Sequence, residues 1–162
     1  MNLILIAAMS ENNIIGDKGK IPWKIPEDLK RFRELTLNHP VIMGRKTYDS
    51  LSEKNKPLPN RKNIILSKSL EYKEGIYVAR TIEEALELTE EKDSYVIGGR
   101  EIYKAFLPYV NMMEITKVHK HYEGDTSFPE IDWDEWKLIK RENKTEEVSY
   151  SFLSYILNKE TL

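Results

Sequence analysis

The chain is 162 residues long, with 40% hydrophobic and 32% charged residues, and we expect residues 1–162 to form a single globular domain. Its formal net charge of −2 argues against a broad electrostatic surface for nucleic acid or membranes, so any basic site must be local. The absence of cysteine excludes disulfides, thiolate nucleophiles and thiolate metal sites, and any redox chemistry would need a bound cofactor.

The first predicted element is a strand at residues 3–9, within the apolar run NLILIAAMS. No basic residue precedes this run and it is too short to span a bilayer, so we interpret it as a buried strand and not as a signal peptide. We therefore expect a cytoplasmic protein. The segment that follows, 10–24, has no predicted element and contains Gly16 and Gly19. A loop of this length in a compact domain is often functional, although a solvated connector is an equally good interpretation.

The next element is an amphipathic helix at 26–36 that carries an acid on its apolar side. At ~100° per residue, Asp28 falls on the same side as the apolar residues Ile25, Leu29, Phe32 and Leu35. The charged residues Glu27, Lys30, Arg31 and Glu34 are predicted to point the other way. A carboxylate among apolar neighbours must find a strong donor, shift its pKa, or both. The alternative is that Asp28 only complements the helix N-terminus.

Apolar runs and helical patterns then alternate along the chain. Their continuous hydrophobicity predicts strands covered on both faces, as in a mostly parallel sheet, at 40–44, 63–67, 76–79 and 94–99. Helices are predicted at 45–51, 81–90 and 100–107, with Thr81 and Glu84 as a capping box for the second of these.

After Pro108 three further runs, MMEITKV, WKLI and YSFLSYIL, predict strands without long helices between them, and hence antiparallel additions to one edge of the sheet. The expected fold is an α/β single domain. It has a mixed, mostly parallel sheet of about eight strands with an antiparallel C-terminal edge, flanked by about four helices.

Three of the predicted strands end in similar segments: Gly44-Arg45-Lys46-Thr47, Ser67-Lys68 and Gly98-Gly99-Arg100. Ligands of open α/β sheets bind beyond the carboxyl ends of the strands, where glycines allow close approach and helix N-termini favour anions. Neither GxGxxG nor GxxxxGK[ST] is present, which disfavours a P-loop kinase. The local cations, with Arg80, and the lack of an acid placed to accept from a ribose 2′-hydroxyl favour a nicotinamide dinucleotide of the NADP type over NAD.

Other chemistries have little support in the sequence. His39, His119 and His121 do not form a convincing metal site, so we expect no metal. No Ser-His-Asp or paired-carboxylate arrangement can be argued from the spacing.

Taken together, Ala8, the loop through Ile21-Pro22-Trp23, Asp28, GRKT, PLPNRKNIILS, VIGGREIY and EGDTSFPE resemble the bacterial chromosomal form of dihydrofolate reductase, in order and across essentially the whole chain. The resemblance implies NADPH-dependent reduction of 7,8-dihydrofolate to 5,6,7,8-tetrahydrofolate, by hydride transfer to pterin C6 and protonation of N5. It implies that Asp28 accepts hydrogen bonds from the pterin, that Thr116 joins this network through water, and that Ile21 and Trp23 belong to a lid of residues 9–24 that gates water. Gly124 and Asp125 would support this lid.

The same resemblance assigns the binding residues. Those implied for the substrate are Ile6, Ala8, Asp28, Leu29, Phe32, Leu51, Leu58, Arg61, Ile97, Tyr103 and Thr116, with Arg61 clamping the glutamate α-carboxylate. Those implied for NADPH are Ala8, Ile15, Gly44, Arg45, Lys46, Thr47, Leu66, Ser67, Lys68, Arg80, Ile97, Gly98, Gly99, Arg100, Tyr103 and Thr126. The Gly98-Gly99 peptide is expected to be cis.

Two other functions remain open from the sequence alone. One is a reductase of the same fold that acts on a pyrimidine intermediate of flavin synthesis, and the other is a non-catalytic NADPH-binding module. The expected partners are the small-molecule substrate and NADPH, with no nucleic acid and no membrane, and the expected state is a monomer.

Overall fold

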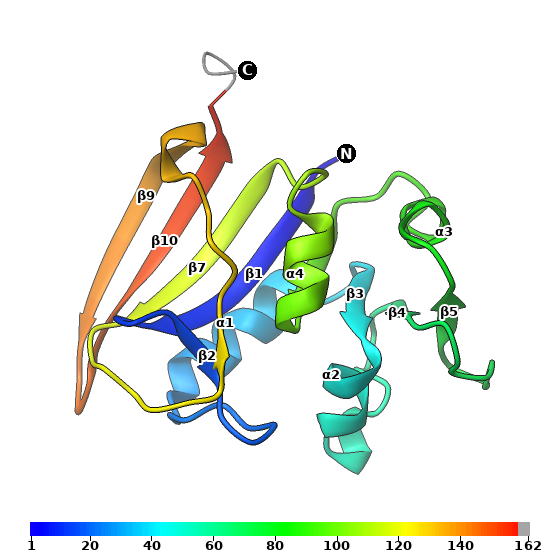
Figure 1. Ribbon diagram of the computed structural model, residues 1–162, viewed down its shortest axis with the longest axis horizontal. Coiled ribbons are helices and arrows are strands. Elements are labelled where there is room, and N and C mark those ends of the chain that lie inside the picture. The colour runs from blue at the N-terminus through cyan, green and yellow to red at the C-terminus, as the bar shows by residue number, and fades with distance from the viewer. Residues whose placement is uncertain (159–162) are drawn as a thin grey trace.

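The computed structural model describes residues 1–158 and contains an α/β domain built on one large sheet (Figure 1). The strands are β1 Leu3–Ser10, β2 Ile14–Gly16, β3 Val41–Gly44, β4 Asn63–Leu66, β5 Tyr77–Ala79, β6 Ser94–Gly98, β7 Met112–Val118, β8 Thr126–Ser127, β9 Trp136–Thr145 and β10 Ser149–Leu157. The helices are α1 Pro26–Thr36, α2 Arg45–Ser50, α3 Ile82–Leu88 and α4 Arg100–Phe106, with short 3-10 helices at Glu53–Asn55 and Trp133–Glu135.

The large sheet has eight strands in the order β5-β4-β3-β6-β1-β7-β10-β9. All neighbouring strands from β5 to β7 are parallel, and β10 is antiparallel to both β7 and β9. The predicted fold class, a mostly parallel sheet with an antiparallel C-terminal edge and four helices, is confirmed. One detail was wrong: residues 112–118 are parallel to β1, with Ala8 opposite Thr116. The chain returns through α4 before β7 begins, and a helix of this kind is the crossover that a parallel neighbour requires.

The predicted boundaries of the helices agree with the structure to within one or two residues. At the start of α3 the Glu84 backbone N–H donates to Thr81 Oγ1 over 3.1 Å, as a capping box requires. The Glu84 carboxylate accepts from the backbone N–H of Arg80, one residue before the cap, over 2.6 Å.

Two parts of the sheet structure were not predicted. β9 extends to Thr145, well beyond the predicted WKLI. The extension was missed because the exposed second half of the strand is polar and has no apolar pattern. Within the segment 10–24, residues 14–16 pair with residues 126–127 as the small β2–β8 sheet. This pairing joins segments more than 100 residues apart, so no local pattern indicates it.

The core lies on both faces of the sheet. On one face, which Figure 1 shows in front, α3 and α4 pack through Ala85, Tyr103 and Phe106. On the other face α1 and α2 pack through Phe32, Leu35 and Tyr48. The central strands are therefore buried on both sides, as their continuous apolar runs predicted. Among the described residues, no helix is long and apolar enough to cross a membrane.

Candidate active site

The three similar strand ends lie at one edge of the sheet. β4, β3 and β6 are neighbours and run parallel, with Gly44 opposite Leu66 and Met43 opposite Gly98. Their carboxyl ends therefore meet, which is the arrangement the sequence predicted. β1 lies on the other side of β6 and brings Ala8 to the same edge.

Asp28 on α1 faces the sheet, where it meets Thr116 on β7. Thr116 is 3% exposed, and its Oγ1 donates a hydrogen bond of 2.6 Å to Asp28 Oδ1. The contact is direct, and a water-mediated link from Thr116 to the pterin stays a prediction. Thr116 is opposite Ala8 of β1 in the strand pairing, so Asp28 lies beside the carboxyl end of β1.

Burial raises the pKa of the Asp28 carboxyl above its usual value, while the hydrogen bond from Thr116 and the charge of Arg31 act in the opposite direction. A carboxylate that is costly to ionise and is held by one strong donor is typical of a functional site. The expectation that Asp28 is sheltered and needs a donor is thus confirmed.

The buried face of α1 differs from the prediction at two positions. Leu29 is 57% exposed, although it was expected on the apolar stripe with Ile25, which is 4% exposed. Arg31 was expected to point into solvent, and it instead donates to Glu114 Oε2 on β7 over 2.5 Å. Phe32 and Leu35 contact the sheet, and at ~100° per residue Arg31 is closer to Leu35 than Leu29 is. The acid on β7 that attracts Arg31 cannot be seen in the pattern of the helix.

Several residues assigned to the pterin by resemblance form one continuous apolar surface under α1. Ile6 and Leu58 are buried in the core cluster on this face, and partly buried residues pack against them, namely Phe32, Leu51 and Ile97. The structure therefore brings together residues from β1, α1, β6 and the loop between α2 and β4.

Arg61 lies at the far end of α1 from Asp28. Its Nη1 donates to Thr36 Oγ1 over 3.0 Å and its Nε donates to the Pro59 carbonyl over 2.9 Å, which fixes the plane of the guanidinium. Burial, together with the charge of Arg33, lowers the pKa of Arg61. Thr36 is fully buried and was not among the predicted site residues, because its role depends on a residue 25 positions away.

Asn63 is a second residue that the sequence analysis missed. It is 1% exposed and closes the loop that carries Leu58 and Arg61. Its Oδ1 accepts from the Leu58 backbone N–H over 2.9 Å, and its Nδ2 donates to the carbonyls of Leu58 and Arg61 over 3.0 and 2.9 Å. Asn63 was assigned to an apolar strand, where a polar first residue gave no functional signal.

Tyr103 and the Gly98-Gly99 peptide lie at the centre of the site, where β1 and β6 are neighbours. The Tyr103 hydroxyl lies 2.8 Å from the Ile6 carbonyl and 2.9 Å from the Ile97 carbonyl, and burial raises the pKa of Tyr103. The Gly98-Gly99 peptide is cis, as expected. Gly98 has a φ of 118°, and a Cβ there would lie 3.1 Å from the Tyr103 hydroxyl, so this position requires glycine.

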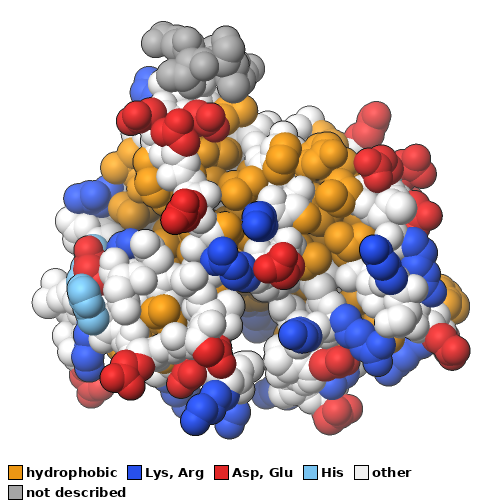
Figure 2. Space-filling model, viewed as in Figure 1, with side chains coloured by type: hydrophobic (Ala, Val, Ile, Leu, Met, Phe, Trp, Pro, Cys, Tyr) orange, Lys and Arg blue, Asp and Glu red, His pale blue; other side chains and the backbone are white. Residues whose placement is uncertain are grey.

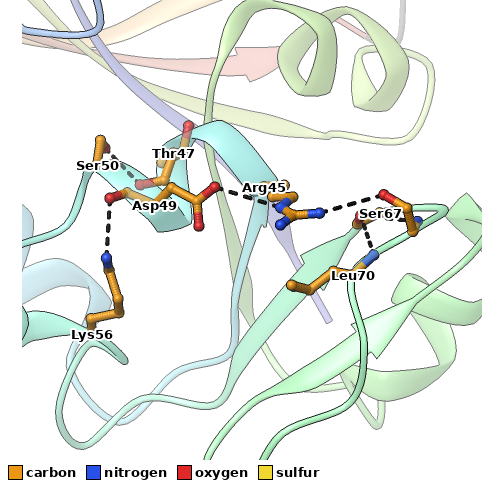
Figure 3. Close-up of polar contacts among 8 residues, drawn as sticks. Arg45, Thr47, Asp49, Ser50, Lys56, Ser67 and Leu70 are labelled. Atoms are coloured by element: carbon orange, nitrogen blue, oxygen red, sulfur yellow. Dashed lines mark hydrogen bonds and ion pairs between the residues drawn. The ribbon is translucent and has the colours of Figure 1, made fainter.

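The cations predicted for the cofactor surround the ends of β3 and β4. Arg45 Nε lies 3.5 Å from Asp49 Oδ2 on the next turn of α2, and Nη1 donates to Ser69 Oγ over 3.5 Å (Figure 3). The Ser67 hydroxyl accepts from the backbone N–H of Leu70 over 3.0 Å (Figure 3). The Ser67 carbonyl accepts from Arg80 Nη1 over 2.8 Å.

Arg45 and Arg80 are therefore held in position by neighbouring residues, while Lys46 and Lys68 extend from the same edge as exposed side chains. Lys and Arg side chains gather on this part of the molecule, around α2 and β5 (Figure 2). Thr47 lies beside Gly99, because a Cβ on Gly99 would be 3.7 Å from Thr47 Oγ1.

Arg100 was predicted to contact the cofactor. In the structure its Nη1 donates to the carbonyl and the hydroxyl of Ser127 on β8, over 2.9 and 3.0 Å. It therefore ties the start of α4 to the strand that carries Thr126, and a contact between Arg100 and the cofactor stays a prediction.

The segment 10–24 is held against the loop at 122–127. The Lys18 backbone N–H donates to Asp125 Oδ2 over 3.0 Å, and the rings of Trp23 and Tyr122 lie 5.2 Å apart. A Cβ on Gly124 would lie 2.5 Å from Ile14 Cγ2 and 2.6 Å from the Gly16 carbonyl, so the close approach of these loops needs glycine. Ile15 is partly buried against the core, whereas Ile21 is 57% exposed.

Three comparisons with known proteins agree with one another. The family model described as dihydrofolate reductase matches residues 2–159. The dihydrofolate reductase of Bacillus subtilis is 37% identical over 156 residues, which cover 93% of this chain and 91% of that protein. That of Buchnera aphidicola subsp. Acyrthosiphon pisum is 43% identical over 158 residues, covering 94% and 97%. Among solved structures, dihydrofolate reductase from Enterococcus faecalis complexed with NADP(H) and RAB-propyl has a TM-score of 0.88 at 33% identity, covering 98% of this chain and 97% of that one.

Proposed function

This chain belongs to the dihydrofolate reductase family, and we propose that the residues gathered around Asp28 form its active site. The activity is NADPH-dependent reduction of 7,8-dihydrofolate to 5,6,7,8-tetrahydrofolate. Family membership across the whole chain displaces the two alternatives, a pyrimidine reductase of flavin synthesis and a non-catalytic module. The observation that carries the proposal is the sheltered Asp28 carboxylate, held by Thr116 beside the strand ends.

In the proposed substrate complex Asp28 accepts hydrogen bonds from the pterin N3–H and 2-amino groups. Thr116 donates to the same carboxylate, and this fixes the direction in which its remaining lone pairs point. Hydrogen bonds to a charged acceptor contribute roughly 1.5–3 kcal/mol each, which is enough to set the orientation of the ring. Ile6, Ala8, Leu29, Phe32, Leu51, Leu58, Ile97 and Tyr103 form the walls around the pterin and the benzoyl group. Arg61 binds the glutamate α-carboxylate through the fork that Thr36 and Pro59 hold in place.

The strand ends fit a dinucleotide. Gly98 and Gly99 present backbone without side chains, and Arg45, Lys46, Lys68 and Arg80 supply positive charge beside them. We assign NADPH to these residues together with Ala8, Ile15, Gly44, Thr47, Leu66, Ser67, Ile97, Arg100, Tyr103 and Thr126. When bound, NADPH supplies the hydride that is added to pterin C6.

The chain itself contributes orientation and control of water. Two rings that react must be aligned at near-contact, so fixing the pterin through Asp28 supplies much of the acceleration. Asp28 holds the edge of the ring that is remote from N5, so we assign delivery of that proton to water. The segment 9–24, with Ile21 and Trp23, acts as a lid that gates this water, and the contact between Lys18 and Asp125 supports the lid position seen here.

We also propose a monomeric, cytoplasmic protein. The apolar N-terminal run is β1 at the centre of the sheet, which supports its assignment as a structural element. The exposed edge strand β9 carries several charged residues, among them Lys140, Arg141 and Lys144, and charged edges oppose pairing between sheets. Size-exclusion chromatography with light scattering tests the monomer, and a mass near 38 kDa, about twice that of the 19.1 kDa chain, would contradict it.

Replacement of the acid tests the function most directly. Asp28→Asn keeps the shape of the side chain but removes its charge, and we expect turnover to fall by roughly two or more orders of magnitude. The assay follows absorbance at 340 nm with NADPH and dihydrofolate. The affinity for NADPH should stay within about twofold, because Asp28 does not contact the proposed cofactor surface. The matched control is Glu27→Gln, which neutralises the adjacent exposed acid and should leave turnover unchanged. Full activity in Asp28→Asn would remove Asp28 from the mechanism.

A further inference from the structure

Arg31 occupies a position that its place on α1 did not predict. Its guanidinium donates to Glu114 Oε2 on β7, and its Cζ lies 4.5 Å from the centre of the Phe152 ring on β10. The side chains of Arg31 and Glu114 are only 20% and 13% exposed. An ion pair that is shielded from water in this way interacts more strongly with other nearby charges than a surface pair does.

Glu114 is in turn fixed by a second contact. The Ser154 hydroxyl on β10 donates to the same Oε2 atom over 2.7 Å. Arg31, Glu114, Ser154 and Phe152 thus form a cluster, which we call the Arg31 cluster, that joins α1 to β7 and β10. It lies on the same face of the sheet as Asp28, because Thr116 and Glu114 are two residues apart on β7 and so point to the same side.

The charges around Asp28 come from several elements. Arg31 and the exposed Glu27 are on its own helix, Glu114 and the hydroxyl of Thr116 are on β7, Tyr103 is on α4 and Tyr150 is on β10. Burial is the main cause of the raised pKa of both tyrosines, and the charge of Asp28 adds to it. Among these groups only Arg31 carries a positive charge. Glu114 forms its ion pair with Arg31, and of these groups Arg31 is the one whose charge favours the ionised form of Asp28.

We propose that Arg31, held in place by Glu114, is a positioning residue that keeps Asp28 ionised for the pterin. The proposal rests on the assignment of Asp28 to substrate binding and adds a reason why a carboxylate with a large burial cost remains usable there. Glu114 has two effects in this arrangement: it holds the guanidinium on the side of α1 that carries Asp28, and it balances part of the guanidinium charge. Removing one partner or the other should therefore change Asp28 in opposite directions.

The test measures ionisation of Asp28 directly, by carbon-13 NMR titration of the side-chain carboxyl in the substrate-free protein, with the Asp28→Asn variant to assign the signal. We expect Arg31→Met, which keeps an apolar stem beside Phe152, to raise the pKa of Asp28. Glu114→Gln keeps an oxygen that can accept from Arg31 and Ser154 but removes the balancing charge, so it should lower the pKa of Asp28. Lys30→Met, which removes an exposed positive charge from the adjacent position on α1, should leave the titration unchanged.

Kinetics give a second readout. Arg31→Met should raise KM for dihydrofolate by roughly two- to fivefold, the effect of one partly screened charge, with the largest change on the acid side of the pH profile. The affinity for NADPH should not change. The proposal is wrong if both variants move the pKa of Asp28 in the same direction. It is also wrong if Arg31→Met lowers Tm but leaves the pKa of Asp28 unchanged, because Arg31 would then be only structural. The titration does not depend on turnover, so a chain that failed to reduce dihydrofolate would refute the proposed function while leaving this electrostatic test intact.

Discussion

The hydrogen bond between Thr116 and Asp28 is the contact whose removal should have the clearest effect on catalysis. Thr116→Val replaces the hydroxyl with a methyl group of similar size, so packing at this 3% exposed position is retained while the 2.6 Å bond to Asp28 is lost. A hydrogen bond to a charged group contributes roughly 1.5–3 kcal/mol. Of the factors that favour the ionised form of Asp28, only the charge of Arg31 then remains.

The loss should appear mainly in the handling of dihydrofolate. If half of the interaction is recovered by water, about 0.8–1.5 kcal/mol is lost, and kcat/KM should fall by roughly 4- to 13-fold. Because the bond favours the charged carboxylate, its removal should also raise the pKa of Asp28 and move the acid side of the pH profile to higher pH. The assay is steady-state turnover at 340 nm between pH 5 and pH 9, together with NADPH binding by fluorescence.

A buried threonine elsewhere provides the control. Thr89 is fully buried at the end of α3, and its Oγ1 donates to the Leu86 carbonyl over 2.6 Å. Thr89→Val should lower the free energy of unfolding by about 1 kcal/mol and leave the pH profile in place. A Thr116→Val protein with the kcat/KM and pH profile of the wild type would show that Thr116 does not act on Asp28.

Three further outcomes follow from the site. Burial raises the pKa of Asp28 above its unfolded value, so the wild type should lose stability as pH rises through the folded pKa. The Asp28→Asn protein should therefore gain free energy of unfolding relative to wild type across that pH range. Denaturant titrations from pH 3 to pH 8 measure this difference, and a constant difference would contradict the prediction. Gly124→Ala places a Cβ 2.5 Å from Ile14 Cγ2, so Tm should fall by roughly 3–10 °C in differential scanning calorimetry. An unchanged Tm would mean that the two loops can separate at no cost in stability. NADPH should bind at least about tenfold more tightly than NADH, because Arg and Lys at the strand ends can bind a 2′-phosphate, and equal dissociation constants in a titration would exclude this.

The elements that the sequence predicts well are those with a local apolar pattern. The runs that became β1, β3, β4 and β6 are buried on both faces, and their consecutive apolar residues predict this burial. The grouping of their carboxyl ends follows from parallel order alone. The long polar part of β9 and the β2–β8 pairing have no such pattern, because one is exposed and the other depends on contacts between distant segments.

The same distinction explains which residues of the candidate active site could be identified from the sequence. Asp28 could be singled out because a helix of known periodicity carries it among apolar residues. Arg31 was assigned to the solvent face because nothing on α1 reveals Glu114, which lies 83 positions away. Asn63 and Thr36 act by holding the loop and side chain of Arg61, and a buried polar residue gives no signal of this kind until its partners are known.

The position of β1 has a consequence for how the chain folds. β1 is made first, yet its two neighbours are residues 94–96 and 112–118, so neither exists until more than half of the chain has been synthesised (Figure 1). An N-terminal fragment that ends after α3 contains no partner for either edge of this strand, although it contains β3, β4 and β5. Such sequence-distant pairing slows folding and leaves apolar edges open to aggregation in the meantime. A nascent chain of this protein therefore depends on its second half before its most apolar strand can be sheltered from water.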